Sequence, residues 1–160
     1  MVQVTIEYMI MVPLLILQIF LFPLVAGWVM NDWTTSRQTL ELQTTASHLG
    51  SQIQQIYFSL NHATITMGNV TAATEISPFI EGYPYNVSGT SRLAPNSGSV
   101  ILDLNLTLVY SFVSATASVT LGSNTTVAWK PSSFLSNSTA QIQAAKLSNG
   151  TIQLSFVKPP

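Results

Sequence analysis

The sequence predicts an α+β fold, in which a long hydrophobic N-terminal helix precedes a small antiparallel β-sandwich. Three observations support this prediction. Residues 8–31 form an uncharged and almost wholly apolar run. Apolar residues then recur on a helical period as far as residue 60. After that point, short segments alternate apolar with polar residues and are separated by Gly, Pro, Asn and Ser, as is typical of strands and turns.

The apolar run is the first element. As a helix, its 24 residues would extend about 36 Å, slightly more than the ~30 Å hydrocarbon core of a bilayer. Pro13 and Pro23 lie inside it, and a membrane or a tight helical bundle tolerates them as kinks. Trp28 and Trp33 flank its end, either as an interfacial aromatic belt or as packing anchors. We therefore expect this run to lie in lipid, against other copies of the chain, or in each at different times.

The helix is predicted to continue to about residue 62 with one amphipathic face. Its apolar stripe contains Leu42, Ala46, Leu49, Ile53, Ile56 and Leu60. Its other faces carry Gln38, Gln43, Thr44, Ser47, Gln52, Gln54 and Gln55. We expect the stripe to pack on the β domain, so the predicted division is a helix at 1–62 and a β-sandwich at 63–160.

The β domain is predicted to contain seven short strands. They are expected at 63–72, 85–93, 99–112, 115–121, 125–129, 140–147 and 151–157. Residues 99–112 give the strongest pattern, with Val100, Leu102, Leu104, Leu106 and Leu108 on one face. Residues 121–124 read as a turn, and Ser148-Asn-Gly150 predicts a hairpin. Seven strands in this length favour an immunoglobulin-like sandwich.

Composition argues against several function classes. Only 7% of residues are charged, against ~25% in ordinary soluble domains. The net charge is -1 and the basic residues are scattered, so we expect no nucleic-acid partner. His48 and His62 have no neighbouring metal-ligand cluster, and Glu75 and Glu81 read as loop residues. We therefore predict no enzyme activity, no metal and no cofactor.

Six Asn-x-Ser/Thr sequons follow the helix and none lies within it. They begin at Asn69, Asn86, Asn105, Asn124, Asn137 and Asn149. This distribution predicts N-linked glycans on the outer surface of the β domain, with chance clustering in a chain rich in Asn, Ser and Thr as the alternative.

The N-terminus reads Gln3-Val4-Thr5-Ile6-Glu7-Tyr8 before the apolar run. With the long helix and the β-rich remainder, this resembles archaeal type IV pilin-like proteins. The resemblance implies Gln3, Thr5, Glu7 and Tyr8 as an assembly and processing motif, where a leader peptidase cuts next to the helix. It also implies that helices of many subunits form a filament core.

The N-terminus departs from the pilin pattern in two ways. Only Met1 and Val2 precede Gln3, so we expect either a leader absent from this form of the chain or a subunit that is not cleaved. Met11 also stands where the pattern often has leucine, which is a mild change.

Glu7 has two interpretations on physical grounds. A carboxylate at the edge of an apolar helix is costly to bury unless it is paired, and the N-terminal amine of a neighbouring chain would pair it and set the register between subunits. Alternatively, Glu7 lies in water as a helix-start acid that the helix dipole favours. We expect Glu7→Ala to abolish or scramble assembly while the β domain still folds.

Three functions follow from these features. The first is a structural subunit of an extracellular adhesive pilus, inserted in the cytoplasmic membrane before assembly. Its implied partners are identical subunits, a membrane platform with its ATPase, and a leader peptidase. The second is a monomeric membrane-anchored receptor or solute-binding domain, which explains the length of the helix less well. The third is a motility filament subunit, which the sequence pattern does not separate from an adhesive one.

Overall fold

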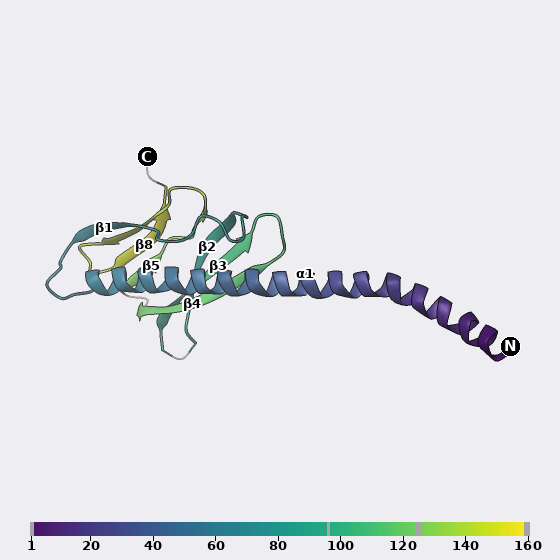
Figure 1. The fold of residues 1–160 in the computed structure, drawn as a ribbon. Helices are drawn as coiled ribbons and strands as arrows, with labels where there is room; N and C mark the ends of the chain where they lie inside the picture. The colour runs from purple at the N-terminus through teal and green to yellow at the C-terminus, as the bar shows by residue number, and fades with distance from the viewer. Residues whose placement is uncertain (1, 96, 124–125, 159–160) are drawn as a thin grey trace. The chain divides into compact units, whose positions relative to one another are not determined.

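The computed structural model describes the backbone of residues 2–95, 97–123 and 126–158, and their side chains from Met9 onward. Within these residues the chain forms one long helix followed by two four-stranded sheets, which confirms the predicted α+β class (Figure 1). The elements are α1 (Val2–Leu60), β1 (Gly68–Ala73), β2 (Tyr85–Leu93), β3 (Ser99–Leu108), β4 (Ser114–Ser123), β5 (Val127–Trp129), β6 (Ser132–Leu135), β7 (Gln141–Lys146) and β8 (Ile152–Val157).

The two sheets have the strand orders β1-β7-β8-β5 and β4-β3-β2-β6. Every described pairing is antiparallel except that of β5 with β8, which is parallel. The second, third and fourth strands lie in one sheet, whereas an immunoglobulin domain divides them between two. The prediction of two packed sheets is therefore confirmed, but the strand order differs from that of an immunoglobulin domain.

The chain divides into two compact units, Met1–Arg37 and Gln38–Pro160. This division falls inside α1, whereas the predicted division at residue 62 separated the helix from the strands, and α1 ends at Leu60. The second unit, which we call the head, contains residues 38–60 of the helix together with all eight strands. The described part of the first unit up to Trp33, which we call the apolar segment, comprises residues 9–33.

Residues 38–60 of α1 fill one side of the core of the head. Leu42, Ala46, Leu49, Ile53 and Leu60 are buried as predicted, and Ile56 is half-buried. Tyr57 joins them, although the prediction omitted it. The placement of Gln38 on a polar face is wrong, because Gln38 is buried. It lies four residues before Leu42, and a side chain at that spacing falls on the same helical stripe.

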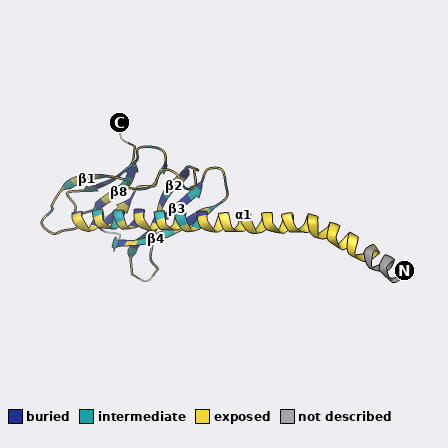
Figure 2. Ribbon diagram, viewed as in Figure 1, coloured by how far each residue is buried: buried dark blue, intermediate teal, exposed yellow. Residues whose placement is uncertain are grey.

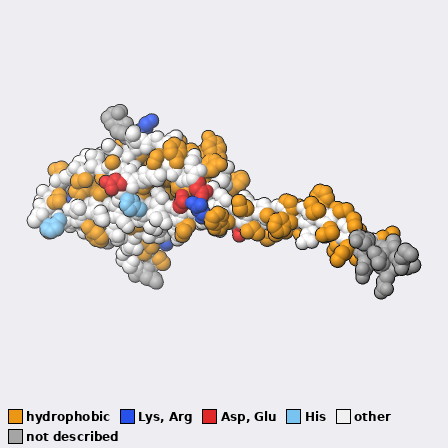
Figure 3. All heavy atoms as spheres, viewed as in Figure 1, with side chains coloured by type: hydrophobic (Ala, Val, Ile, Leu, Met, Phe, Trp, Pro, Cys, Tyr) orange, Lys and Arg blue, Asp and Glu red, His pale blue; other side chains and the backbone are white. Residues whose placement is uncertain are grey.

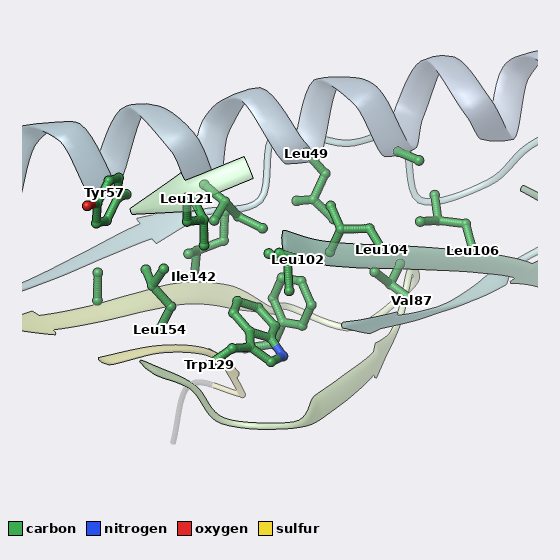
Figure 4. Close-up of a cluster of buried hydrophobic side chains, with 14 of the residues drawn as sticks. Leu49, Tyr57, Val87, Leu102, Leu104, Leu106, Leu121, Trp129, Ile142 and Leu154 are labelled. Atoms are coloured by element: carbon green, nitrogen blue, oxygen red, sulfur yellow. The ribbon is translucent and has the colours of Figure 1, made fainter. Parts of the chain in front are cut away.

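The core lies between the helix and the inner faces of both sheets (Figure 4). All five alternating apolar residues of β3 are buried, as the sequence predicts. Gly50 allows the helix to approach the sheet, because a Cβ there would collide with Val119. Gly89 likewise leaves room for the ring of Trp129, whose Nε1 donates to the Gly89 carbonyl at 2.9 Å. The indole therefore joins the two sheets by packing and by a hydrogen bond.

The connections between strands show where local sequence signals were sufficient. Ser148–Gly150 makes the predicted hairpin, with Gly150 at a φ of 84° and its N–H donating to the Leu147 carbonyl at 2.9 Å. The predicted turn at residues 121–124 is wrong at its start, since β4 continues to Ser123. Strand β6 was not predicted, because it has only four residues and directly follows Pro131.

Ser136 organises a buried polar cluster that the sequence did not indicate. Its hydroxyl accepts from the Tyr85 N–H at 2.9 Å and donates to the Pro78 carbonyl at 2.7 Å. The Tyr85 hydroxyl donates to the Ser77 carbonyl at 2.5 Å, and burial raises the pKa of Tyr85 to about 12. These bonds fasten the segment before β2 to the turn after β6.

Candidate assembly surface

The apolar segment exposes its side chains around the whole helix. Every described residue from Met9 to Arg37 is exposed (Figure 2), and Phe20, Phe22 and Leu24 are 73%, 74% and 75% accessible. Its most apolar 18-residue window has a mean hydropathy of 2.5 and is long and apolar enough to cross a membrane. Burying one such side chain contributes about 1.5–3 kcal/mol. Contact with lipid or with other apolar protein surface would therefore stabilise the segment strongly.

Two grooves run along the surface of this segment. The first has a volume of about 630 Å³ and is lined by Met11, Leu14, Leu15, Leu17, Gln18, Leu21, Phe22 and Val25. The second, of about 540 Å³, is lined by Pro13, Ile16, Leu17, Phe20, Leu21 and Leu24. Residues 11, 18 and 25 are seven apart, the spacing of a helix that packs along another helix. The grooves are thus suited to accept side chains from a second apolar helix.

Pro13 and Pro23 are accommodated without ending the helix. Neither can donate the hydrogen bond that the Met9 or Ile19 carbonyl would accept in a regular helix, so each proline removes one hydrogen bond of the helix. Figure 1 shows α1 curving along its N-terminal part, consistent with proline as a cause of helix bending. In lipid or in a bundle, neighbouring groups offset this loss.

Polar contacts begin where the uncharged run ends. Thr34 and Thr35 each donate a hydroxyl hydrogen bond to the carbonyl four residues earlier, at 2.9 Å. The Arg37 guanidinium lies 5.6 Å from the centroid of the Trp33 ring, a cation–π distance. Trp28 and Trp33 are 74% and 61% exposed, so neither is an internal packing anchor of this chain. The predicted aromatic belt remains a prediction.

The motif at the start of the helix is placed only in part. Gln3, Thr5, Glu7 and Tyr8 lie within α1 by backbone, and their side chains are outside the described residues. The register and processing roles expected for them therefore stay predictions from the sequence.

Five of the six sequon asparagines are exposed: Asn69, Asn86, Asn105, Asn137 and Asn149. Asn124 lies outside the described residues. Asn137 and Asn149 are in turns, and Asn69 is on β1, the edge strand of its sheet. Each of these five side chains could therefore carry a bulky group without displacing the core.

Two of these sequons face each other across β2 and β3. Asn86 is opposite Thr107, and Ser88 is opposite Asn105. Each asparagine therefore lies beside the hydroxyl residue of the other sequon. A sugar on Asn86 and a sugar on Asn105 would share the same small area of the sheet.

The outer face of this sheet also holds an ion pair. Arg92 Nε donates to Asp103 Oδ2 at 2.6 Å, and Ser118 Oγ donates to Asp103 Oδ1 at 2.5 Å. Partial burial would by itself raise the pKa of Asp103, but the hydrogen bonds from Ser118 and Arg92 outweigh it and hold that pKa below its usual value. These three residues come from neighbouring strands β2, β3 and β4, so no local motif could have revealed them.

A small polar groove lies between α1 and the segment around β1. It has a volume of about 270 Å³ and is lined by His48, Ser51, Gln52, Gln55, Ile56, Ala72, Ala73 and Glu75. His48 from α1 and Glu75 from the segment after β1 therefore line the same groove, a placement that their separation in the sequence did not indicate. In the described part of the chain, no three His, Asp or Glu side chains gather as a metal site would require.

Comparisons with known protein families, with curated proteins and with solved structures find no match to this chain.

Proposed function

We propose that this chain is the repeating subunit of an extracellular archaeal type IV-like pilus. The apolar segment resides in the cytoplasmic membrane before assembly and packs against identical segments in the filament. The observation that carries this proposal is the exposed, uncharged helical surface between Met9 and Asn31 (Figure 3). The pilin-like residues Gln3 to Tyr8 in front of it add the resemblance.

The physical argument is that membrane and bundle are interchangeable for such a surface. Lipid tails are as apolar as leucine, so helix association inside the membrane depends on packing and on the few polar groups. Once many helices surround one another, each covers apolar area that would otherwise require lipid. The head has its own buried core and does not need the apolar segment to bury its strands.

The head would form the outside of the filament and serve adhesion. Its exposed sequons support N-linked glycans at Asn69, Asn86, Asn105, Asn137 and Asn149, with Asn124 as the sixth site. The outer face of the β4-β3-β2-β6 sheet is rich in Ser, Thr and Asn, which keep a low-charge surface hydrated. Besides identical subunits, the partners are a membrane assembly platform with its ATPase and a leader peptidase.

Intact-mass spectrometry of surface material tests the glycans. We expect a mass above that of the polypeptide, reduced by one glycan in each Asn→Gln variant at an occupied site. Removing Asn86 is expected to raise occupancy at Asn105, because the two sites compete for space. An unmodified mass would contradict this part of the proposal without affecting the filament.

Electron microscopy of filaments sheared from cells tests assembly. We expect the native chain in filaments and Leu21→Gln in the membrane fraction without filaments, because Leu21 lines both grooves. Leu40→Gln is the matched control, since Leu40 is an exposed leucine of the same helix but belongs to the head. Detergent-free native chain that stays monodisperse and single-copy would instead favour the membrane-anchored receptor.

A further inference from the structure

The apolar segment contains two amide side chains, Gln18 and Asn31. Both are exposed, and Gln18 lines the first groove among apolar residues. When a neighbouring helix covers that groove, the amide leaves water, and an amide buried without a partner is costly. Each amide can both donate and accept hydrogen bonds, so each could satisfy the other.

The spacing of the two amides fits a contact between copies in an open polymer. They are 13 residues apart, which corresponds to an axial separation of about 20 Å and to about 140° around the helix. An open helical polymer uses a heterologous contact, in which one face of each copy meets a different face of the next. Because they are about 140° apart, Gln18 and Asn31 lie on different faces of the helix, as such a contact requires.

Gly27 is well placed for a close contact at the same offset. It lies four residues before Asn31, and Leu14 lies four residues before Gln18, so each pair shares a helical face. A shift of 13 residues consequently places Leu14 of one copy opposite Gly27 of the next. Among the described residues, a Cβ at Gly27 would meet nothing within 4 Å apart from the adjacent helix backbone, and a helical glycine costs about 1 kcal/mol relative to alanine. Small residues in membrane helices allow a neighbouring helix to come close.

We propose that neighbouring copies pack in parallel with an axial offset of 13 residues, so that Gln18 of one copy hydrogen-bonds with Asn31 of the next. The inference rests on the proposed function and specifies its contact. It assigns Gln18 the role that a buried polar residue has in coiled coils, where one amide fixes the register at some cost in stability. It assigns Gly27 to the close approach beside that pair.

Cysteine cross-linking in assembled filaments tests the offset, because the chain contains no native cysteine. A disulfide requires Cα atoms within about 7 Å. With the double variant Gln18→Cys/Asn31→Cys, we expect oxidation to give a ladder of covalent multimers, since each copy offers one thiol to each neighbour. Either single variant should give no ladder.

The matched control is Gln18→Cys/Leu24→Cys. Leu24 lies seven residues before Asn31 on nearly the same face, but its axial level differs by about 10 Å. A ladder from this control pair, or a covalent dimer from Gln18→Cys alone, would overturn the proposed offset. The dimer would indicate that copies pack in register.

Gly27→Leu provides a second test that does not depend on thiols. The substitution makes the segment more apolar, so it stays in the membrane, but it fills the space that Leu14 of the next copy needs. We expect at least a tenfold loss of filaments, with Ala26→Leu, which lies on another face, close to native. Normal filaments from Gly27→Leu would contradict the close approach.

Helical reconstruction of native filaments separates this inference from the proposed function. We expect contacting apolar segments to be offset by about 20 Å. Filaments with another offset would overturn the inference and leave the proposed function standing. Absence of this chain from surface filaments would instead remove the proposed function itself.

Discussion

The two parts of α1 differ in what covers them. Leu42, Leu49 and Ile53 have no accessible surface, because the strands of the head cover them. Leu15 and Leu21 are 56% and 51% exposed, although they are leucines in the same helix. One part completes a fold within the chain, and the other presents the same kind of apolar surface outward. The comparison shows that burial here is decided by neighbours and not by residue type.

The largest expected difference between the two parts of α1 is in the stability effect of truncating a leucine. Leu49→Ala should lower the free energy of unfolding of the head by about 2–5 kcal/mol, because it leaves a cavity against the sheet. Leu21→Ala should leave that free energy unchanged, since no residue of the head has to collapse around it. Hydrogen exchange of the strand amides in detergent measures both. Equal destabilisation by the two variants would show that the parts are not independent.

A medium effect is expected from the buried serine. Ser136→Ala should cost about 1–3 kcal/mol, because the Tyr85 N–H and the Pro78 carbonyl lose their partner. Ser133→Ala is the control, since Ser133 is exposed on the neighbouring strand β6 and should change stability by less than ~0.5 kcal/mol. Denaturant titration of each variant gives the values. A neutral Ser136→Ala would mean that water replaces the hydroxyl.

The smallest effect concerns Asp103 and pH. Its folded-state pKa is lowered from 3.8, so its contribution is present above about pH 4 and is lost as the pH falls through the lowered pKa. Because the Arg92 and Asp103 side chains are 54% and 22% exposed, we expect less than ~1 kcal/mol. Asp103→Asn should remove that part of the acid dependence in thermal melts from pH 2 to 6. If the loss of thermal stability at low pH were the same in Asp103→Asn as in the native chain, other carboxylates would be responsible for it.

Periodicity was sufficient to predict most of the fold. The stripe from Leu42 to Leu60 and the alternating residues of β3 follow directly from helical and strand spacing, and the sequon asparagines are exposed wherever they are described. The change from helical to strand patterning near residue 62 marks the end of the helix, which the structure places at Leu60. The compact unit that forms the head begins earlier, at Gln38, because the second part of the helix packs on the strands.

The remaining features depend on contacts between distant residues. Strand β5 pairs in parallel with β8 because Lys130 donates to Leu154 and Ile152 donates to Thr126, both across more than twenty positions. The Arg92–Asp103–Ser118 group and the Ser136 cluster likewise join separate strands. No local pattern specifies such partners. In the sequence, the first groove of the apolar segment corresponds only to the seven-residue spacing of Met11, Gln18 and Val25.

The pairing of β1 with β7 has a consequence for biosynthesis. Gly68 of β1 pairs with Lys146 of β7. The Lys146 Nζ also donates a hydrogen bond to the Leu60 carbonyl, at the end of α1, at 3.0 Å. The first sheet therefore cannot close until β7 has left the ribosome. Loop closure over such distances is slow, so the N-terminal hydrophobic stretch is synthesised well before the head is folded.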